Sequence, residues 1–306
     1  MGGFSMLDIL VRAGCYVGII VLGWFLRKKE FFGPDAFGTL SKIVIRITLP
    51  AAIISNCSGK SLNPALLVLA LFGLGGGCLY MAAAWLLSRG QSREDRVFAL
   101  VNTTGYNIGN FSTPFIQSFL GPMGVVATSI FDIGNCFICM GGSYGLGRSL
   151  LHGGKLNVGK ILKEPLKIPP FLTYLLMAIL NLLGWTLPKP ILTFAEIVGS
   201  ANAFLAMLVI GIGFQLSGDQ SQFKTIARVL VPRYAIAAVL ALCYYYLLPF
   251  DLVVRQTLVI LAFSPIGSAT PVFTRQLGCD AGLSSAINSI AIVISITIIV
   301  VLLMVM

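Results

Sequence analysis

The chain has 306 residues, of which 57% are apolar and only 10% are charged. A soluble domain of this size carries roughly a quarter charged residues, so these charges are too few to cover a water-facing surface. The composition therefore predicts an integral membrane protein surrounded by a lipid bilayer. The net charge of +10 comes from short basic groups between apolar runs, without an aromatic-interleaved basic patch, and this distribution excludes nucleic acid as a partner.

Seven cysteines are scattered along the chain, most of them in apolar segments. Their odd number and their placement argue against a framework of disulfides. Cys136 and Cys139 have the C-x-x-C spacing but lie inside an apolar run, which favours packing thiols over redox or metal chemistry. Because the sequence has no metal-ligand cluster and no nucleophile–base set, we expect no metal, no cofactor and no enzyme activity.

A helix needs about 20 mainly apolar residues to cross a bilayer, and such runs recur along the whole chain. The first run is long and lacks the small-residue cleavage site of a signal peptide, so no cleavable signal peptide is expected. We predict an all-α polytopic protein with ten spans, at 7–26, 36–57, 64–88, 97–119, 124–147, 168–187, 190–216, 226–248, 254–276 and 282–306.

The connections between these spans are short, and the longest, 148–167, is expected to form an interfacial amphipathic turn. Its basic residues include His152, Lys155, Lys160, Lys163 and Lys167. A lone histidine in a loop is typical of a solvated side chain, so we do not expect His152 to be a ligand.

Basic residues are divided unequally between the two sides of the predicted bundle. Four lie on one side: Arg12, Lys60, Lys189 and Arg255. Fifteen lie in the connections that follow spans 1, 3, 5, 7 and 9: Arg27, Lys28, Lys29, Arg89, Arg93, Arg96, Arg148, Lys155, Lys160, Lys163, Lys167, Lys224, Arg228, Arg233 and Arg275. Because basic connections stay in the cytoplasm, we predict a multi-pass protein of the cell membrane with both termini outside.

Five spans per half make the second half enter the membrane from the opposite side, which is the geometry of inverted repeats. We therefore divide the chain into a first five-helix repeat, 1–150, and a second, 151–306. The best internal match joins 107–121 in span 4 with 265–278 in span 9. Each segment has Ile-Gly, small polar residues, Thr-Pro and a glycine seven residues after that proline.

Proline inside a helix removes a backbone hydrogen bond and clashes with the preceding turn. In a membrane the freed backbone groups must meet protein or a water-filled cavity, so two matching breaks indicate a transporter's midplane site rather than simple packing kinks. The N–H groups of the half-helices would face an anion, and the freed carbonyls would hold a cation. The predicted lining is Asn107, Asn110, Ser112, Thr113, Pro114, Pro265, Ser268, Thr270 and Pro271.

Two charged residues lie deep in predicted spans, where a charge is a functional hypothesis by default. Arg46 is ten residues into span 2, about 15 Å deep at 1.5 Å per residue, and Asp132 lies at a similar depth in span 5. Asp132 shares a helical face with Thr128, Asn135 and Cys139. Either Arg46 and Asp132 form a structural ion pair, or Arg46 binds a carboxylate while Asp132, with Asn135, couples transport to protons or sodium.

Two further patterns are a polar pair in span 10 and two clusters of glycines. Asn288 and Ser289 in span 10 lie near the position that corresponds to Asp132 in the other repeat. Glycines cluster at 73–77 and 141–147; no strand precedes them, so a dinucleotide-binding loop is excluded. Close approach of neighbouring helices explains them better.

Several features along the chain resemble the auxin efflux carrier family of permeases. They are the segments Phe25–Phe32, Leu40–Val44 and Thr48–Ala52, the spacing of Asn107 and Pro114, and Pro265 with Thr270–Phe273. The resemblance covers essentially the whole chain and, since the connection between spans 5 and 6 is short, fits the prokaryotic type. It implies a scaffold of spans 1, 2, 6 and 7, through which a homodimer would form. Spans 3–5 and 8–10 would form a moving domain in which spans 4 and 9 cross at the substrate.

The resemblance implies small organic anions as substrates, such as auxin in plants and malate or malonate in bacteria. Arg46 departs from a mostly uncharged position of the family and fits a substrate more anionic than auxin, such as a dicarboxylate. The leading hypothesis is alternating-access transport of a small carboxylate. A cation/proton antiporter that uses Asp132, and a receptor or scaffold that does not translocate, stay open as alternatives.

Overall fold

The computed structural model describes residues 6–60, 63–153, 157–215 and 222–306. Every regular element in these ranges is helical, which confirms the prediction of an all-α protein. Seven helical runs within them are long and apolar enough to cross a membrane. An eighth is added if the pair Val158–Lys167 and Pro169–Leu182, bent by 83°, counts as one span. The chain is therefore a multi-pass membrane protein.

The first half of the chain forms seven α-helices linked by short π- and 3-10-helical turns. Predicted span 2 is divided by a π-helical turn at Val44–Thr48. The helices are α1 (Met6–Lys28), α2 (Ala36–Ile43), α3 (Leu49–Cys57), α4 (Leu69–Leu87), α5 (Arg93–Thr103), α6 (Thr113–Phe137) and α7 (Ser143–His152).

The stretch from Arg93 to His152 turns back on itself near its middle. Gly121 has φ 65° and ψ −162°, outside the helical region, and Pro122 follows it. Positive φ is accessible to glycine at little steric cost, so this pair can reverse the chain inside an apolar run. As a result α5 packs against α7, and the stretch contains both predicted spans 97–119 and 124–147.

The second half begins with a short helix, α8, that lies in the connection 148–167. Lys160 and Lys163 are exposed on it, and Asn157 caps its first turn by accepting a hydrogen bond from the backbone N–H of Lys160; Lys155 lies outside the described residues. The helices are α8 (Val158–Lys163), α9 (Pro169–Leu182), α10 (Lys189–Ser200), α11 (Asn202–Gly213), α12 (Phe223–Leu247), α13 (Leu252–Ala262), α14 (Thr270–Gln276) and α15 (Ala281–Val305).

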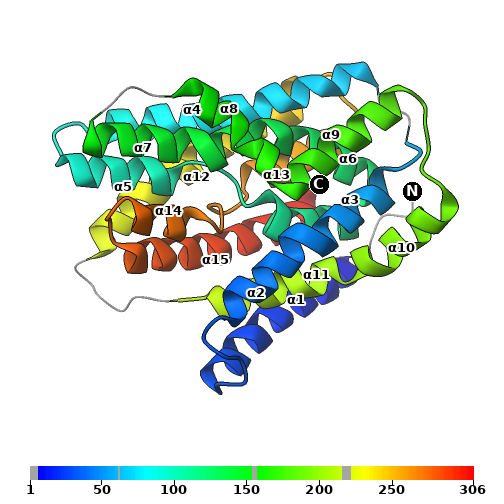
Figure 1. The fold of residues 1–306 in the computed structure, drawn as a ribbon, viewed down its shortest axis with the longest axis horizontal. Helices are drawn as coiled ribbons and strands as arrows, with labels where there is room; N and C mark the ends of the chain where they lie inside the picture. Colours follow the sequence, from blue (N-terminus) through cyan, green and yellow to red (C-terminus); the bar gives the residue numbers. More distant parts are fainter. Residues whose placement is uncertain (1–5, 61–62, 154–156, 216–221) are drawn as a thin grey trace.

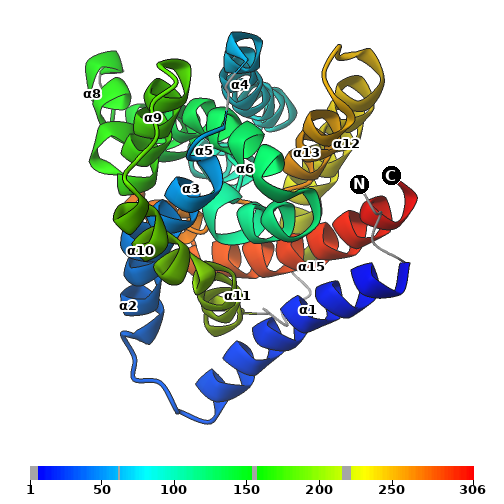
Figure 2. The same ribbon diagram turned by 90° about the vertical axis from the view of Figure 1, so that its right-hand side faces the viewer.

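Helices far apart in the sequence pack in pairs. In Figures 1 and 2, α1, α2, α10 and α11 gather on one side of the molecule, where α1 runs along α11 and α3 packs on α10. Elsewhere α4 packs on α6, α13 on both α6 and α12, and α14 on α15. The breaks in 104–107 and 263–269 lie between these groups, so helices of both halves surround them.

Glycines let the most closely packed pairs approach. A side chain at Gly73 of α4 would meet the backbone carbonyl of Phe131 in α6, and one at Gly134 of α6 would meet the carbonyl of Ala70 in α4. By contrast, a side chain at Gly75 would meet nothing within 4 Å. Close helix approach therefore accounts for Gly73 but not for Gly75 of the first cluster.

Gly73→Val is expected to lower the free energy of unfolding by about 1–3 kcal/mol, because backbone of α6 must move to admit the side chain. The measurement is the thermal unfolding midpoint of the purified protein in detergent. Gly75→Val on the same helix is the matched control and should leave the midpoint nearly unchanged. Equal midpoints for the two variants would contradict this account of the α4–α6 contact.

Candidate functional site

The two helix breaks meet in the interior and are bonded to one another, whereas Pro114 and Pro271 lie in the first turns of α6 and α14 that follow them, not inside a helix as predicted. In the first half, α5 ends at Thr103 and helical structure resumes at Ile108; in the second, α13 ends at Ala262 and α14 begins at Thr270. The backbone N–H of Asn107 donates to the carbonyl of Pro265 at 2.9 Å. The structure therefore brings the two predicted half-sites together, although 158 residues separate Asn107 from Pro265 in the sequence.

Side chains add two further bonds between the breaks. The amide Nδ2 of Asn110 donates to Oγ of Ser268 at 2.9 Å, and the hydroxyls of Ser112 and Ser264 are hydrogen-bonded to each other. Ser264 was not among the residues predicted from the sequence. These bonds join the two halves of the chain directly.

The remaining predicted residues support the backbone of the breaks. The hydroxyl of Thr113 donates to the carbonyl of Ile108 at 3.0 Å, and the carbonyl of Pro114 accepts from Tyr16 of α1 at 3.2 Å. The carbonyl of Thr270 accepts from the hydroxyl of Thr274 at 2.9 Å. Their polar groups thus stabilise the local backbone, whereas the side chains of Asn107, Asn110, Ser268 and Pro271 face a cavity.

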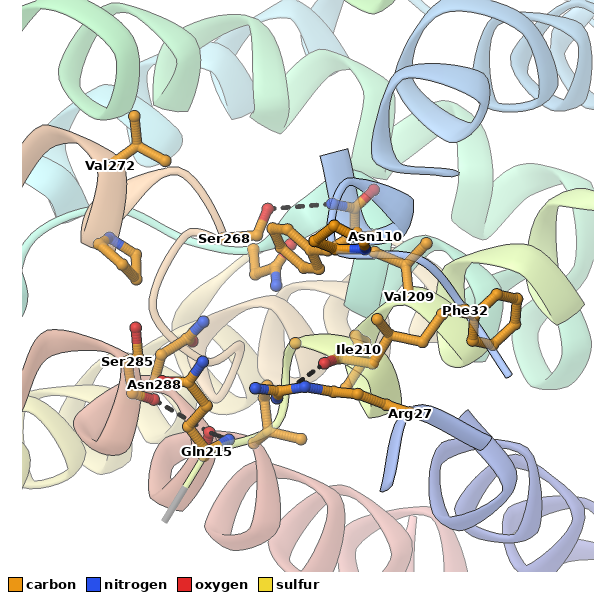
Figure 3. A pocket seen from close by; sticks show the side chains of 18 of the residues that line it. Arg27, Phe32, Asn110, Val209, Ile210, Gln215, Ser268, Val272, Ser285 and Asn288 are labelled. Atoms are coloured by element: carbon orange, nitrogen blue, oxygen red, sulfur yellow. Dashed lines mark hydrogen bonds between the residues drawn. The ribbon is translucent and has the colours of Figure 1, made fainter. Parts of the chain in front are cut away.

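This cavity has a volume of about 520 Å³ and lies between α1, α11, α14 and α15. Asn110 and Ser268 line one part of it, and Gln215, Ser285 and Asn288 line another (Figure 3). Two cationic side chains, Arg27 and Arg275, also line it, and its described lining includes no Asp or Glu. The cavity is therefore polar on several walls and carries positive charge.

Three amide atoms at this cavity are buried without a hydrogen-bond partner among the described residues: Nδ2 of Asn107, Oδ1 of Asn110 and Oδ1 of Asn288. Asn107 and Asn110 are each 4% exposed. Buried polar groups are normally paired, and an unpaired one carries a desolvation penalty of about 1–3 kcal/mol. Such a group at a cavity is what a binding site requires, because a ligand can supply the missing partner.

A smaller cavity of about 70 Å³ shares Asn107, Asn110 and Ser268 with the first and is also lined by Asp132 and Asn135. Nδ2 of Asn135 donates to Oδ1 of Asp132 at 2.7 Å. The two predicted coupling residues are therefore in direct contact and lie beside the breaks.

Asn135 also fixes the backbone of the first break. Its Oδ1 accepts from the N–H of Tyr106 at 3.1 Å, and its Nδ2 donates to the carbonyl of the same residue at 3.2 Å. One side-chain amide thus satisfies both backbone groups that the break leaves free at Tyr106, and links them to Asp132.

Arg46 lies apart from these residues. It is in the π-helical turn Val44–Thr48, which packs on the turn Ile108–Ser112, but its side chain is exposed and lines neither of the two cavities. No ion pair joins Arg46 to Asp132 within the described ranges. Its predicted role at the substrate therefore stays a prediction.

Sequence reasoning missed Arg233. We assigned it to the connection between spans 7 and 8, and that assignment was wrong, because Arg233 lies in the interior of α12 and is only 1% exposed. Fourteen of the fifteen basic residues are left on the predicted cytoplasmic side. The signal was present, because Arg233 is seven residues inside the apolar run 226–248. Its guanidinium donates to carbonyls of both breaks: Thr103, Gly105, Ser264 and Pro265.

A multi-pass helical protein with two broken helices bonded to each other at a polar cavity has the arrangement expected of a membrane transporter. Residues 16–151 match the model of the membrane transport protein family. The described residues contain no group of three or more His, Cys, Asp or Glu side chains that could hold a metal ion.

A curated protein of Methanothermobacter thermautotrophicus, named an uncharacterized transporter, is 26% identical to the chain over 204 residues. The match covers 65% of this chain and 65% of that protein, which is less than two thirds of the relative's length. Together with the family match, it confirms the resemblance to the auxin efflux carrier family.

Asn135→Ala is expected to destabilise the protein by about 2 kcal/mol or more, because both backbone groups of Tyr106 lose their partner in a buried position. The measurement is again the thermal unfolding midpoint in detergent. Thr297→Ala is the control, since Thr297 is exposed and its hydroxyl bonds only its own helix at Val293. A midpoint for Asn135→Ala no lower than that of the control would refute this role.

Proposed function

We propose that the protein is a secondary transporter of small organic anions of the carboxylate class. The observation that carries the proposal is the buried, unpartnered Nδ2 of Asn107 at a cavity that also holds Arg27 and Arg275 and no described carboxylate. The free Nδ2 of Asn107 is a hydrogen-bond donor, and a donor requires an acceptor such as a carboxylate oxygen.

The size and charge of the cavity support the same ligand class. A volume of about 520 Å³ falls within the range of roughly 300–1,000 Å³ that is typical of small-molecule sites. Arginine binds carboxylates through two parallel N–H bonds, and two arginines raise the local concentration of anions. A small mono- or dicarboxylate therefore fits better than a cation or an apolar molecule.

The location of the cavity supports alternating access. Arg27, Phe32 and Arg275, which line it, belong to connections predicted to be cytoplasmic from the distribution of basic residues. We propose that this conformation opens to the cytoplasm and that both termini lie outside the cell membrane. The opposite conformation would expose the breaks to the other side.

Ten spans in two inverted repeats are part of this proposal. The reversal at Gly121 supports two spans within Arg93–His152, α9 would form span 6 after the connection that holds α8, and α13 with α14 would form one broken span. The spans before and after the middle of the chain would then enter from opposite sides. The pairing of α1 with α11 and α3 with α10 supports a scaffold of spans 1, 2, 6 and 7 beside a moving domain.

A second candidate is a cation/proton antiporter, and Asp132 is the observation that favours it. Its carboxylate is 6% exposed, is bonded to Asn135 and lines the small cavity next to the breaks. A membrane receptor or scaffold would also bind a ligand, but it would not need two broken helices bonded to each other. Coupling of anion movement to protons or sodium through Asp132 is compatible with the main proposal.

Asn107→Ala is expected to raise the KM for carboxylate uptake into proteoliposomes about 10- to 100-fold, because the free Nδ2 donor of Asn107 is lost and a hydrogen bond to a charged group contributes about 1.5–3 kcal/mol. A thermal-shift screen of mono- and dicarboxylates selects the substrate for this measurement, since a bound ligand stabilises the folded state. Uptake that is unchanged in Asn107→Ala would remove this cavity from the transport path.

The same uptake assay tests whether Arg275 or Arg46 binds the substrate. Arg275→Gln should raise the KM, whereas Arg148→Gln, which changes an exposed arginine outside this cavity, is the matched control. Arg46→Ala tests the prediction made from the sequence. Loss of transport in Arg46→Ala with normal KM in Arg275→Gln would place the substrate near α3 instead.

Asp132→Asn is expected to abolish the response of transport to an imposed proton or sodium gradient, while carboxylate binding in the thermal-shift assay persists. The amide keeps the size of the carboxylate and one acceptor oxygen for Asn135, but it cannot bind or release a proton. If the gradient response survives in Asp132→Asn, Asp132 is not the coupling group, and the antiporter alternative is contradicted because Asp132 is the residue on which it depends.

A further inference from the structure

Two helices end in the interior of the protein with their carboxyl termini close together. The final turn of an α-helix leaves up to four carbonyls without a partner in the helix, and it carries about half an elementary negative charge. After α5 these carbonyls include Thr103, and after α13 they are followed by those of Ser264 and Pro265. The carbonyls of Thr103, Ser264 and Pro265 all face a single side chain, that of Arg233 on α12.

The guanidinium of Arg233 binds four carbonyls: the last one of α5, one from the first break and two from the second. Nη1 donates to Thr103 at 2.5 Å, and Nη2 lies 2.8 Å from the carbonyl of Gly105. Nη2 also lies 2.8 Å from the carbonyl of Ser264 and 3.2 Å from that of Pro265. One cation therefore binds the last carbonyl of α5 and carbonyls of the backbone that follows α5 and α13, and so links the two breaks.

The other neighbours of this guanidinium are aromatic. The rings of Tyr80 and Tyr106 have their centroids 4.8 and 5.6 Å from its Cζ atom, within the range of cation–π attraction. No salt bridge involves Arg233 in the part of the chain that the structure describes. Its charge is balanced by carbonyl dipoles and ring faces instead of a carboxylate.

Several carbonyl oxygens from unwound helices around one buried cation form the coordination that transporters and channels use for Na⁺ or K⁺. We propose that the guanidinium of Arg233 is a built-in cation that occupies the position of an exchangeable metal ion between the two breaks. The inference rests on the proposed transport function and deepens it, since the site then carries a permanent positive charge next to the anion cavity. Binding of the substrate would need no Na⁺ or K⁺ at these four carbonyls.

Because the guanidinium of Arg233 is covalently part of the chain, it stabilises the folded state differently from a bound metal ion. A bound metal ion stabilises the folded state only in proportion to its concentration relative to its Kd, whereas Arg233 is present at every salt concentration. Removing the guanidinium while keeping the carbonyls should therefore expose a latent cation site. The wild-type protein and a variant that keeps a charge at this position should show no such site.

Arg233→Gln and Arg233→Lys form the matched pair for this test. Glutamine has no charge and leaves these four carbonyls without a cation, whereas lysine retains a cation with three donors. Arg228→Gln is the control for a loss of charge on α12, because Arg228 is exposed. Arg233→Ser is a second neutral variant that leaves more room for a cation.

The measurement is the thermal unfolding midpoint of each purified protein in detergent as choline chloride is replaced by NaCl, KCl or guanidinium chloride at constant ionic strength. Guanidinium is kept at millimolar concentrations, and urea serves as its neutral analogue. Arg233→Gln should have a lower midpoint in choline than wild type, and the midpoint should rise with at least one of the three cations. At 100 times the Kd of that cation, the folding equilibrium shifts about 100-fold.

The unfolding midpoints of wild type, Arg228→Gln and Arg233→Lys should be the same in the three cations as in choline. The proposal is overturned if neither neutral variant is stabilised by any cation, if Arg233→Lys responds as strongly as Arg233→Gln, or if both neutral variants fail to fold in every cation buffer. No transport step enters this measurement. Failure of carboxylate uptake in the wild-type protein would instead count against the proposed function, so the two results are separable.

Discussion

Backbone groups freed by the two helix breaks have no water to bond in the interior of a membrane protein, and the rest of the site follows from how they are satisfied. Arg233 binds the last carbonyl of α5 and carbonyls of the breaks that follow α5 and α13, and Asn135 binds both backbone groups of Tyr106. The bond from Asn107 to Pro265 then joins the breaks themselves. Without these contacts, two interrupted helices in an apolar environment would be strongly unfavourable.

These contacts leave the breaks with two unlike sides. On one side the carbonyls are occupied by the guanidinium of Arg233, so little capacity remains there for a cation from solution. On the other, the amides of Asn107 and Asn110 keep unpaired atoms at the larger cavity. The fixed positive charge and the free amide donor both favour an anion, which is why the arrangement supports carboxylate transport.

The predictions that succeeded depend on local composition. The apolar runs, the Thr-Pro segments and the polar residues around them are visible in the sequence, because each follows from the need to bury or break a helix within a few residues. The same reasoning failed for Arg233. Positively charged residues near a predicted membrane boundary are usually assigned to the connection, and only packing shows that the carbonyls of two other helices surround this one. Ser264 was missed for the same reason, since its bond to Ser112 crosses 152 residues.

The sequence by itself determined an all-helical membrane protein with two matching breaks, since apolar length and proline position are local properties of the chain. Only the tertiary structure decided which groups meet at those breaks. It placed Asp132 with Asn135, left Arg46 exposed, and brought Arg27 and Arg275 to the cavity. The physical reason is that a buried charge is tolerated only where partners from distant segments converge, and the pattern of residues along one helix does not reveal which segments those are.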